Sequence, residues 1–413
     1  MNPLRILVIS NLCPPDFDGG LEMSALQMAT GLKERGHDVH FITSAYRDAY
    51  TGKRSDPEWV HRLLEYVEPG ESGVARFTQF LKVMPLSLEN AQKVESFLVD
   101  REFDAGYLFG LHRIGLASHI PLVVHNIPVL WHLGDTFLAK QLVSWPRKAP
   151  PYDWLLKTVF KEPRALELQG DYDNIAFVSE HLRDYYIASG LKPKNAYVIP
   201  RGVDFELGLD VERERIDPPL FFAASRLHEQ KGLHNAIEAA ALLNKRRPDL
   251  QWQLEIAGRE EQPNYATRLD ELIQRLNIRD RARLVGQLSR EETLAKIRGA
   301  TAILSTPIYE EPFGRTILEA LASGTPLIAS EVGAIREIVD PGESALLYAR
   351  EDAAALSERM EQVLTQPELA RQLAASGIQR VQERFTMDAV LNQVEAVLHE
   401  LILKQREREC ASA

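Results

Sequence analysis

The sequence predicts an α/β protein built from two doubly wound parallel-sheet domains. Short apolar runs typical of buried strands alternate with amphipathic helical segments along the chain, and this alternation favours parallel sheets. The length of 413 residues exceeds what one ordinary hydrophobic core accommodates, which favours two or three domains. A polar stretch at residues 204–219, ending in Asp217-Pro218-Pro219, divides the predicted strands into two sets and predicts the domain boundary.

The apolar runs fall into two similar halves. Those in the first half predict strands at Ile6–Ser10, Val39–Thr43, Ala105–Phe109, Leu122–His125, Ile175–Val178 and Ala196–Ile199. Those in the second half predict strands at Leu220–Ala224, Gln253–Ala257, Arg283–Val285, Ala302–Leu304 and Leu327–Ala329. Each half therefore carries enough strands for a sheet of its own.

A strand, a glycine loop and a helix are predicted at the N-terminus. The apolar run 4–10 predicts a buried strand, and a helix is predicted to begin near Leu21. Between them, Gly19 and Gly20 let the backbone approach a ligand closely because no Cβ intrudes. The helix N-terminus behind them favours anionic or polar groups. No Gly-x-Gly-x-x-Gly fingerprint follows the strand, so a dinucleotide site is not predicted.

A histidine and an asparagine, His125 and Asn126, fall where the predicted strand Leu122–His125 ends. A single histidine after an apolar strand is more often a packed, hydrogen-bonded core residue than a catalyst. Because His125 falls at the end of a predicted strand, the competing hypothesis is that it takes part in a functional site.

Two cations follow the first predicted strand of the second half. Arg226 and Lys231 lie five residues apart on a loop between the strand Leu220–Ala224 and an amphipathic helix predicted near 233–244. Ligands of open α/β sheets bind at the C-terminal ends of strands. There Arg226 could bind a diphosphate through its planar guanidinium, and Lys231 could attract it as a point charge. The alternative is a solvated loop with two ordinary surface cations.

The segment from Glu311 to Glu319 places two carboxylates around a helix start. Pro312, preceded by an acidic residue, predicts a helix N-terminus between Pro312 and Arg315. The free backbone N–H groups there would form an anion site for a phosphate or a sugar hydroxyl. They belong to Phe313, Gly314, Arg315, Thr316 and Ile317. Eight helical positions span about 12 Å, so the two carboxylates can face one cleft; the alternative is a solvated helix face.

These segments occur in the order found in the retaining, glycogen-synthase-like glycosyltransferases of family 4, the glycosyl transferases group 1, which the chain resembles. The Glu-x7-Glu pair resembles that family's signature, and the Arg-x4-Lys pair resembles its diphosphate-binding cations. Gly19-Gly20 resembles its glycine loop, and in the family a histidine in the place of His125 lies beside the transferred sugar and the acceptor. The resemblance covers nearly the whole chain and is strongest over residues 219–341.

The resemblance implies the GT-B fold, in which two Rossmann-like domains face a cleft. It implies an acceptor-binding domain over residues 1–204, a donor-binding domain over residues 205–386, and a C-terminal helix near 387–413 that crosses back to the first domain. It implies a hexosyltransferase that moves a sugar from a nucleoside diphosphate sugar to a hydroxyl, with UDP-sugar as the first expectation and GDP-mannose as the second. The acceptor would be a saccharide, a glycolipid or a small molecule.

The resemblance also implies roles for individual residues. Glu311 would hold hydroxyls of the donor sugar and support positive charge that develops at its anomeric carbon, and Glu319 would accept hydrogen bonds from the ribose. Arg226 and Lys231 would neutralise the leaving diphosphate, so neither a metal nor another cofactor is expected. His125, with Asn126 beside it, would assist the acceptor.

The chain departs from the family pattern at three places. An aspartate often stands where this chain has Asn126, and an asparagine usually stands at Arg201. A second glycine commonly follows two residues after Gly258, whereas this chain continues with Arg259 and Glu260. Arg259 is expected either to supply a cation to the nucleotide or to point to solvent. These departures leave open a scaffold that keeps the fold without chemistry; an epimerase or a phosphorylase on the same fold is the other alternative.

Composition excludes several classes of protein. The net charge of −11 argues against nucleic acid as a partner, because binding phosphates requires a basic face. The two cysteines, Cys13 and Cys410, form neither a metal-ligand pattern nor a disulfide framework. With no signal peptide and no apolar run of about 18 residues, a cytoplasmic protein is expected. The sequence does not predict the oligomeric state.

An aromatic and basic stretch between Trp131 and Arg164 falls outside this pattern. It combines tryptophans with lysines and arginines around a proline-rich break at residues 146–151. Such a mixture suits the surface of a membrane. Because the chain is acidic and the stretch lacks helical periodicity, a loop that shapes the acceptor site or plain packing is favoured over contact with lipid.

Overall fold

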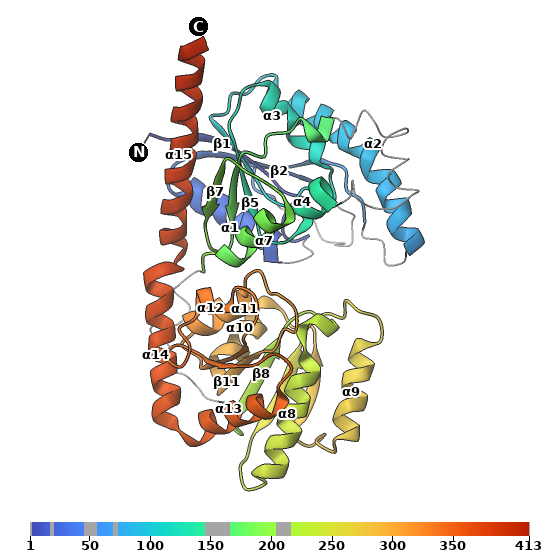
Figure 1. Ribbon diagram of the computed structural model, residues 1–413, viewed down its shortest axis with the longest axis vertical. Coiled ribbons are helices and arrows are strands. Elements are labelled where there is room, and N and C mark those ends of the chain that lie inside the picture. Colours follow the sequence, from blue (N-terminus) through green and yellow to red (C-terminus); the bar gives the residue numbers. More distant parts are fainter. Residues whose placement is uncertain are drawn as a thin grey trace. The chain divides into compact units, whose positions relative to one another are not determined.

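The computed structural model describes residues 2–16, 20–44, 56–68, 73–144, 166–203 and 216–412. The chain divides into two compact units, residues 1–200 with 390–413 and residues 201–389. Each unit is built around its own parallel sheet (Figure 1). Among the helices in the described ranges, none combines the length and the apolar character needed to cross a membrane.

Within the described residues, the first unit contains a sheet of seven parallel strands. The strands are β1 Arg5–Ile9, β2 Asp38–Ser44, β3 Val60–Leu64, β4 Ala105–Leu108, β5 Val129–Leu133, β6 Asn174–Phe177 and β7 Asn195–Val198. Their order is β3-β2-β1-β4-β5-β6-β7, and every neighbouring pair runs parallel. The predictions for β1, β2, β4, β6 and β7 are confirmed to within one residue at each end.

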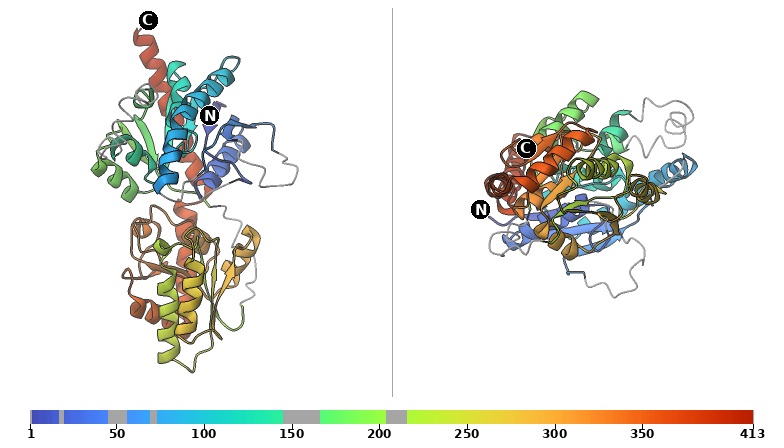
Figure 2. Two further views of the ribbon diagram at one scale, coloured as in Figure 1. Left: turned by 90° about the vertical axis from the view of Figure 1, so that its right-hand side faces the viewer. Right: turned by 90° about the horizontal axis from the view of Figure 1, so that it is seen from below.

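The strand order reverses direction between β1 and β4. From β1 the chain adds β2 and β3 on one side, and β4 to β7 follow on the other. Right-handed crossovers then place helices on both faces of the sheet (Figures 1 and 2). The helical elements are α1 Gly20–Glu34, α2 Gly73–Leu98, the 3₁₀ turn η1 Leu116–His119, α3 Ile120–Val124, α4 Phe137–Ala139, the π turn η2 Lys140–Ser144 and α7 Glu180–Ser189. The crevice at the carboxyl ends of β1 and β4 is the kind of switch point at which open α/β sheets bind ligands.

One predicted strand is wrong. Residues Ile120–Val124 form the helix α3, where a strand was expected at Leu122–His125. Pro121 lies in the first turn, where its missing N–H has no helical partner to lose and its fixed φ suits the helix. The helix ends just before Asn126, whose φ of 56° is a left-handed conformation that asparagine tolerates. The strand follows as β5, which the sequence analysis did not predict.

His119 is buried in the core of the first unit. Its Nδ1 donates to the carbonyl oxygen of Leu116 at 2.5 Å, and its ring packs against Trp131 and Tyr172 with centroids 5.0 and 5.2 Å away. Nε2 is buried and has no hydrogen-bond partner within the described residues. Burial lowers the pKa of His119 to about 4, because a proton added at Nε2 would bring an uncompensated charge into the core.

This histidine should make the first unit sensitive to acid. Since the unfolded chain binds a proton near pH 6.5 and the folded one only near pH 4, the stabilisation is complete above pH 6.5 and is lost as the pH falls towards 4. The loss should be on the order of 3 kcal/mol across that window. Urea unfolding at pH 7 and pH 5 should show a steeper decline for the wild type than for His119→Gln. An equal loss of stability in the two proteins would refute the assignment of this acid sensitivity to His119.

Within the described residues, the second unit contains a sheet of six parallel strands in the order β10-β9-β8-β11-β12-β13. The strands are β8 Leu220–Ala224, β9 Gln253–Ala257, β10 Ala282–Gly286, β11 Ala302–Ser305, β12 Leu327–Ser330 and β13 Leu346–Tyr348. All five predicted strands are confirmed, and only β13 was not predicted. In this sheet, β9 and β10 lie on one side of β8, and β11, β12 and β13 follow on its other side.

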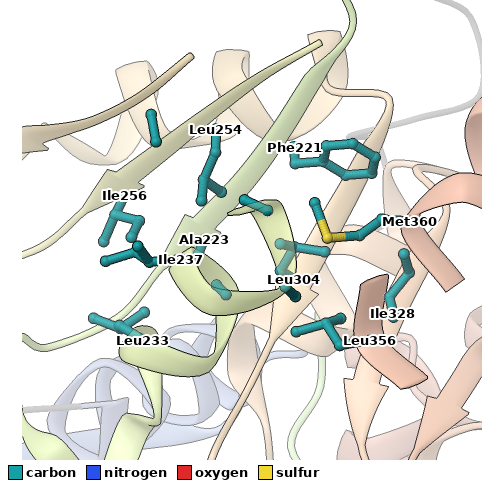
Figure 3. Close-up of a cluster of buried hydrophobic side chains, with 14 of the residues drawn as sticks. Phe221, Ala223, Leu233, Ile237, Leu254, Ile256, Leu304, Ile328, Leu356 and Met360 are labelled. Carbon is teal, nitrogen blue, oxygen red and sulfur yellow. The ribbon is translucent and has the colours of Figure 1, made fainter. Parts of the chain in front are cut away.

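The core of the second unit lies between its sheet and the helices that cover it. The helical elements are η5 Glu229–Lys231, α8 Leu233–Arg246, α9 Tyr265–Arg275, α10 Arg290–Gly299, α11 Arg315–Ala322, α12 Ile335–Ile338, α13 Ala353–Thr365 and α14 Pro367–Arg384. Figure 3 shows α8 and α13 packed over the strands through buried apolar side chains. They include Phe221, Ala223, Leu233, Ile237, Leu254, Ile256, Leu304, Ile328, Leu356 and Met360. This packing fixes the strand ends that carry the candidate site.

The last helix, α15 Met387–Ser412, starts in the second unit and belongs to the first unit from Val390 onwards. The buried Glu395 on this helix accepts a hydrogen bond from Arg35 at 2.8 Å and contacts Nε2 of His37 at 3.0 Å. His37 accepts the backbone N–H of Leu4 at Nδ1, so in the neutral ring Nε2 carries the hydrogen and donates it to Glu395. The C-terminal helix therefore packs on the first unit, as predicted.

Candidate active site

The candidate site lies at the carboxyl edge of the second sheet. The loop after β8 carries Arg226 and Lys231, and the loop after the adjacent strand β11 carries Glu311. The side chain of Thr316 in the first turn of α11 donates to the carbonyl oxygen of Ala224, the last residue of β8, at 3.3 Å. The switch point of this sheet thus brings together the two predicted motifs, which are about 80 residues apart in the sequence.

The position of Lys231 is fixed by its backbone. Gly232 follows it with a φ of +60°, and a Cβ there would lie 2.0 Å from the carbonyl oxygen of Thr306. The hydroxyl of Thr306 in turn donates to the carbonyl oxygen of Lys231 at 2.9 Å. The loops after β8 and β11 are therefore locked together, because only glycine permits this close approach.

Lys231, Tyr309 and Glu311 form a compact polar cluster. Nζ of Lys231 donates to Oε2 of Glu311 at 2.7 Å and to the hydroxyl oxygen of Tyr309 at 3.0 Å. The Tyr309 hydroxyl donates to the same Oε2 of Glu311 at 2.8 Å. The Lys231 and Glu311 side chains are only 17% and 12% exposed, so solvent screens their attraction weakly. The side chain of Glu311 is thereby held in one orientation.

Two arginines, Arg226 and Arg201, lie close enough to act on the charge of this cluster. Burial, and then the Glu311 carboxylate, raise the pKa of Tyr309 well above its ordinary value, so the hydroxyl keeps its proton; the nearby charges of Arg226 and Arg201 act against that rise. Arg226 is 45% exposed and contacts Glu261 through Nη1. An exposed guanidinium that is paired with a single carboxylate can exchange that carboxylate for a phosphate.

The helix α11 begins at Arg315 with Gly314 as its N-cap, inside the predicted range. Gly314 offers no side chain to cap the helix, and its carbonyl oxygen accepts the first helical hydrogen bond, from Leu318. The backbone N–H groups just before Leu318 in this turn donate to no backbone carbonyl oxygen of the described residues. Phe313 is buried and packs edge-on against Phe385. The helix start therefore lies inside the predicted range, and an anion site formed by the backbone N–H groups from Phe313 to Ile317 stays a prediction.

Glu319 lies inside α11 and is nearly buried. Its Oε1 accepts hydrogen bonds from Arg290 at 2.9 Å and from Arg315 at 3.2 Å, and Oε2 has no partner within the described residues. Burial lowers the pKa of Arg315, opposed by the Glu319 charge and assisted by Arg290 and Arg201. An oriented carboxylate with one oxygen left over suits a hydroxyl donor such as a ribose.

The loop after β9 is set by Gly258. A Cβ at this glycine, whose φ is +156°, would lie 1.7 Å from the carbonyl oxygen of Ser225. Arg259 is exposed, and its side chain makes no hydrogen bond or ion pair with the described residues, while its carbonyl oxygen accepts the N–H of Leu227. Gly258 thus packs directly beneath the cation loop, and Arg259 points to solvent.

Sequence reasoning missed three supporting residues. Tyr309 bonds both members of the cluster, Arg290 pairs with Glu319, and Gly333 lies against the backbone of Glu311, where a Cβ would be 2.3 Å from its carbonyl oxygen. Tyr309 could have been found from its place two residues before the signature carboxylate. Arg290 and Gly333 carry no such local signal.

The structure does not bring His125 to a strand's carboxyl edge. It caps the end of α3, on the amino side of β5, and its Nε2 contacts Oε1 of the exposed Glu95 on α2 at 2.9 Å. Asn126 follows in the turn. The predicted strand end at these two residues is therefore wrong, because the helix α3 replaces the strand that was to carry them.

The carboxyl edge of the first sheet holds other polar groups. Gly20 begins α1, whereas Gly19 lies outside the described residues. Asn11, after β1, accepts the backbone N–H of Arg113 at Oδ1 and therefore turns Nδ2 towards Nδ1 of His112, 3.1 Å away. Of the aromatic and basic stretch, Trp131 is buried in β5, and residues 145–164 lie outside the described residues.

The arrangement in the second unit can hold a polyhydroxylated anion. Carboxylates at Glu311 and Glu319 accept hydroxyl groups, while Arg226, Lys231 and the start of α11 attract phosphate. Among the described residues, no group of three or more His, Cys, Asp or Glu side chains is placed to hold a metal ion.

Residues 18–207 match the family model described as Glycosyltransferase Family 4, and residues 209–380 match the one described as Glycosyl transferases group 1. The glycogen synthase of Mycobacterium tuberculosis strain H37Rv is 27% identical over 420 residues, which cover 98% of this chain and 96% of that protein. The similarity therefore extends through both units.

Solved structures share the whole architecture. The sucrose-phosphate synthase of Thermosynechococcus elongatus superposes with a TM-score of 0.75 at 22% identity, covering 97% of this chain and all of that one (100%). The Anabaena protein HepE, solved in complex with UDP-glucose, superposes with a TM-score of 0.67 at 17% identity, covering 96% and 100%. At these identities the likeness establishes the fold, GT-B with two Rossmann-like domains.

Proposed function

The chain belongs to the group 1 glycosyltransferases of family 4, and on that premise we propose that it moves a sugar from a nucleoside diphosphate sugar to a hydroxyl group with retention of the anomeric configuration. The observation that carries the proposal is the Lys231–Tyr309–Glu311 cluster beside Arg226 at the switch point. This cluster offers an oriented carboxylate to sugar hydroxyls and cations to the diphosphate within one loop pair.

In the proposed mechanism the acceptor hydroxyl attacks the anomeric carbon from the face that the diphosphate leaves. The new bond from the acceptor oxygen to that carbon forms as the bond to the phosphate oxygen breaks, and the hydroxyl proton passes to the departing phosphate oxygen. Glu311 holds sugar hydroxyls and supports the positive charge on the anomeric carbon; it is not a nucleophile. Arg226, Lys231 and the N–H groups of α11 stabilise the departing diphosphate without a metal ion.

A uridine nucleotide is the first choice for the donor and GDP-mannose the second. The complex of HepE with UDP-glucose supports a uridine donor on this fold. Sucrose-phosphate synthase, whose name describes a sugar phosphate product, supports a small saccharide acceptor. Glu319 would bond the ribose through Oε2, while Gly258 and Arg259 would border the nucleotide.

Thermal unfolding in the presence of nucleotides tests this function. UDP, GDP, ADP, UDP-glucose, UDP-N-acetylglucosamine and GDP-mannose should be compared, because a ligand that binds only the folded protein at 100 times its Kd stabilises it by about 2.7 kcal/mol. One base should raise the Tm, and the shift should vanish in Arg226→Ala and in Glu319→Ala. The control Arg279→Ala, which removes an exposed cation paired with Asp270 in the same unit, should keep it. If no nucleotide raises the Tm, the proposed donor site is wrong.

A further inference from the structure

The first unit has a switch point of its own, between β1 and β4. Asn11 follows β1 there, and the loop 109–115 follows β4. The backbone N–H of Asn11 donates to the carbonyl oxygen of Gly110 at 2.9 Å, and its carbonyl oxygen accepts the hydroxyl of Ser44, the last residue of β2, at 2.5 Å. In open α/β sheets the crevice at this place binds ligands.

Asn11 fixes the loop after β4 by its side chain as well. Oδ1 accepts the backbone N–H of Arg113 at 3.0 Å, and Nδ2 approaches Nδ1 of His112 at 3.1 Å. Because an amide nitrogen only donates, Nδ1 of His112 is the acceptor, and in the neutral ring Nε2 carries the hydrogen. The backbone that carries the Arg113 side chain is therefore anchored at the switch point.

The Arg113 side chain is half-buried, and no described residue offers a partner for its charge. Its Nε is buried without a hydrogen-bond acceptor, and the guanidinium forms no ion pair with any described residue. Five other arginines of this unit bond carboxylates or carbonyl oxygens. They are Arg5, Arg35, Arg62, Arg101 and Arg183.

Leaving a buried donor of this kind without an acceptor costs free energy, and the cost is larger when the donor is charged. A bound anion would recover that cost, since a guanidinium fork matches the oxygens of a phosphate or a carboxylate. Because the side chain is only half-buried, such an anion can reach it from solvent.

We propose that Arg113 binds an anionic group, a phosphate or a carboxylate, carried by the acceptor. The substrate of the first unit is then an acidic acceptor, such as a sugar phosphate or a hydroxy acid, and not a neutral sugar. The identification of the anion's carrier as the acceptor rests on the proposed glycosyl transfer; the anion site itself does not.

Binding of small anions tests the site without knowledge of the acceptor. Inorganic phosphate and malonate serve as probes, with chloride at matched ionic strength as reference. Since phosphate is also expected at the donor site, the Arg226→Ala protein is the background. In the Arg226→Ala protein, phosphate or malonate should raise the Tm above the value measured in chloride. The double variant Arg113→Ala/Arg226→Ala should lose that shift. An unchanged shift in the double variant, or none in the background, would overturn the proposal.

Matched acceptors test the substrate class. With the donor identified by thermal unfolding, transfer to glucose is compared with transfer to glucose 6-phosphate and glucuronate. The kcat/KM should be at least about tenfold higher for one anionic member, corresponding to about 1.4 kcal/mol. Arg113→Ala should remove that preference through KM, and Arg113→Lys should restore part of it. Arg101→Ala, which removes a cation bonded to the carbonyl oxygen of Phe97, should leave it unchanged. An equal kcat/KM for glucose and for the anionic acceptors, or a preference that survives Arg113→Ala, would contradict the proposal.

The two proposals can fail separately. Arg113→Ala should keep the full rise in Tm caused by the donor nucleotide, because Arg226, Glu311 and Glu319 are unchanged. If nucleotides give no shift while phosphate binding depends on Arg113, the proposed transferase activity fails and the anion site stands. If nucleotides bind and phosphate binding is indifferent to Arg113, only the inference about the acceptor fails.

Discussion

Replacing Glu311 with glutamine should lower the rate of glycosyl transfer at least about 100-fold, a loss typical of removing one preorganised electrostatic contact to a transition state. The substitution removes the negative charge that is proposed to face the anomeric carbon but keeps an acceptor for Lys231 and Tyr309. The fold should therefore survive, and so should the rise in Tm caused by the donor nucleotide, because Arg226 and Glu319 remain. Initial rates at saturating donor measure the effect; Glu311→Ala should also abolish transfer.

The neighbouring carboxylate supplies the control. Glu310 is exposed, and its side chain accepts the backbone N–H of Gly333 at 2.9 Å and lies 3.5 Å from Arg350. Glu310→Gln keeps the hydrogen-bond acceptor and removes an exposed charge that faces Arg350, so activity should stay within a factor of a few of the wild type. A fully active Glu311→Gln protein would disprove the site assignment.

Replacing Gly258 with alanine should destabilise the second unit by about 3 kcal/mol or more, as overpacking and backbone strain each cost about 1–3 kcal/mol. The new Cβ would lie 1.7 Å from the carbonyl oxygen of Ser225 and 2.9 Å from its carbonyl carbon. Both are backbone atoms at the end of β8, so no side chain can rotate away. The Tm of this unit should fall by roughly 6–12 °C in calorimetry.

Gly286, whose carbonyl oxygen accepts the N–H of Gly258 at 2.8 Å, is the matched control. Its φ is +75°, but a Cβ there would meet nothing within 4 Å. Gly286→Ala should thus cost only the unfavourable conformation, about 1 kcal/mol. If the two alanine variants lose equal stability, the close approach at Gly258 is not what requires glycine.

The strands of the second unit could be predicted because buried parallel strands are short continuous apolar runs, as in Phe221–Ala223. The same signal failed at residues 120–133, where two apolar runs follow each other. Periodicity cannot separate a short buried helix from a strand, and Pro121 decided for the helix. The strands β3 and β13, at the ends of their sheets, were missed; β3 is only partly buried and β13 has three residues.

Parts of the candidate site could be predicted from the sequence because the residues of each motif lie close together along the chain. Arg226 and Lys231 share one loop, and Glu311 and Glu319 flank one helix start. Their partners are distant, however: Tyr309 is 78 positions from Lys231, and Arg290 is 29 positions from Glu319. Such contacts depend on which strands become neighbours, and no local pattern encodes this.

By itself, the sequence determined that this chain forms two parallel-sheet domains, and it placed cations and carboxylates at the strand ends and the helix start of the second. Periodicity and residue type suffice for that, since they act over a few positions along the chain. Only the tertiary structure decided that Lys231 pairs with Glu311, that His125 lies off the carboxyl edge, and that the guanidinium of Arg113 pairs with no described residue at a switch point. Those outcomes depend on strand order and burial, which arise when distant segments pack together.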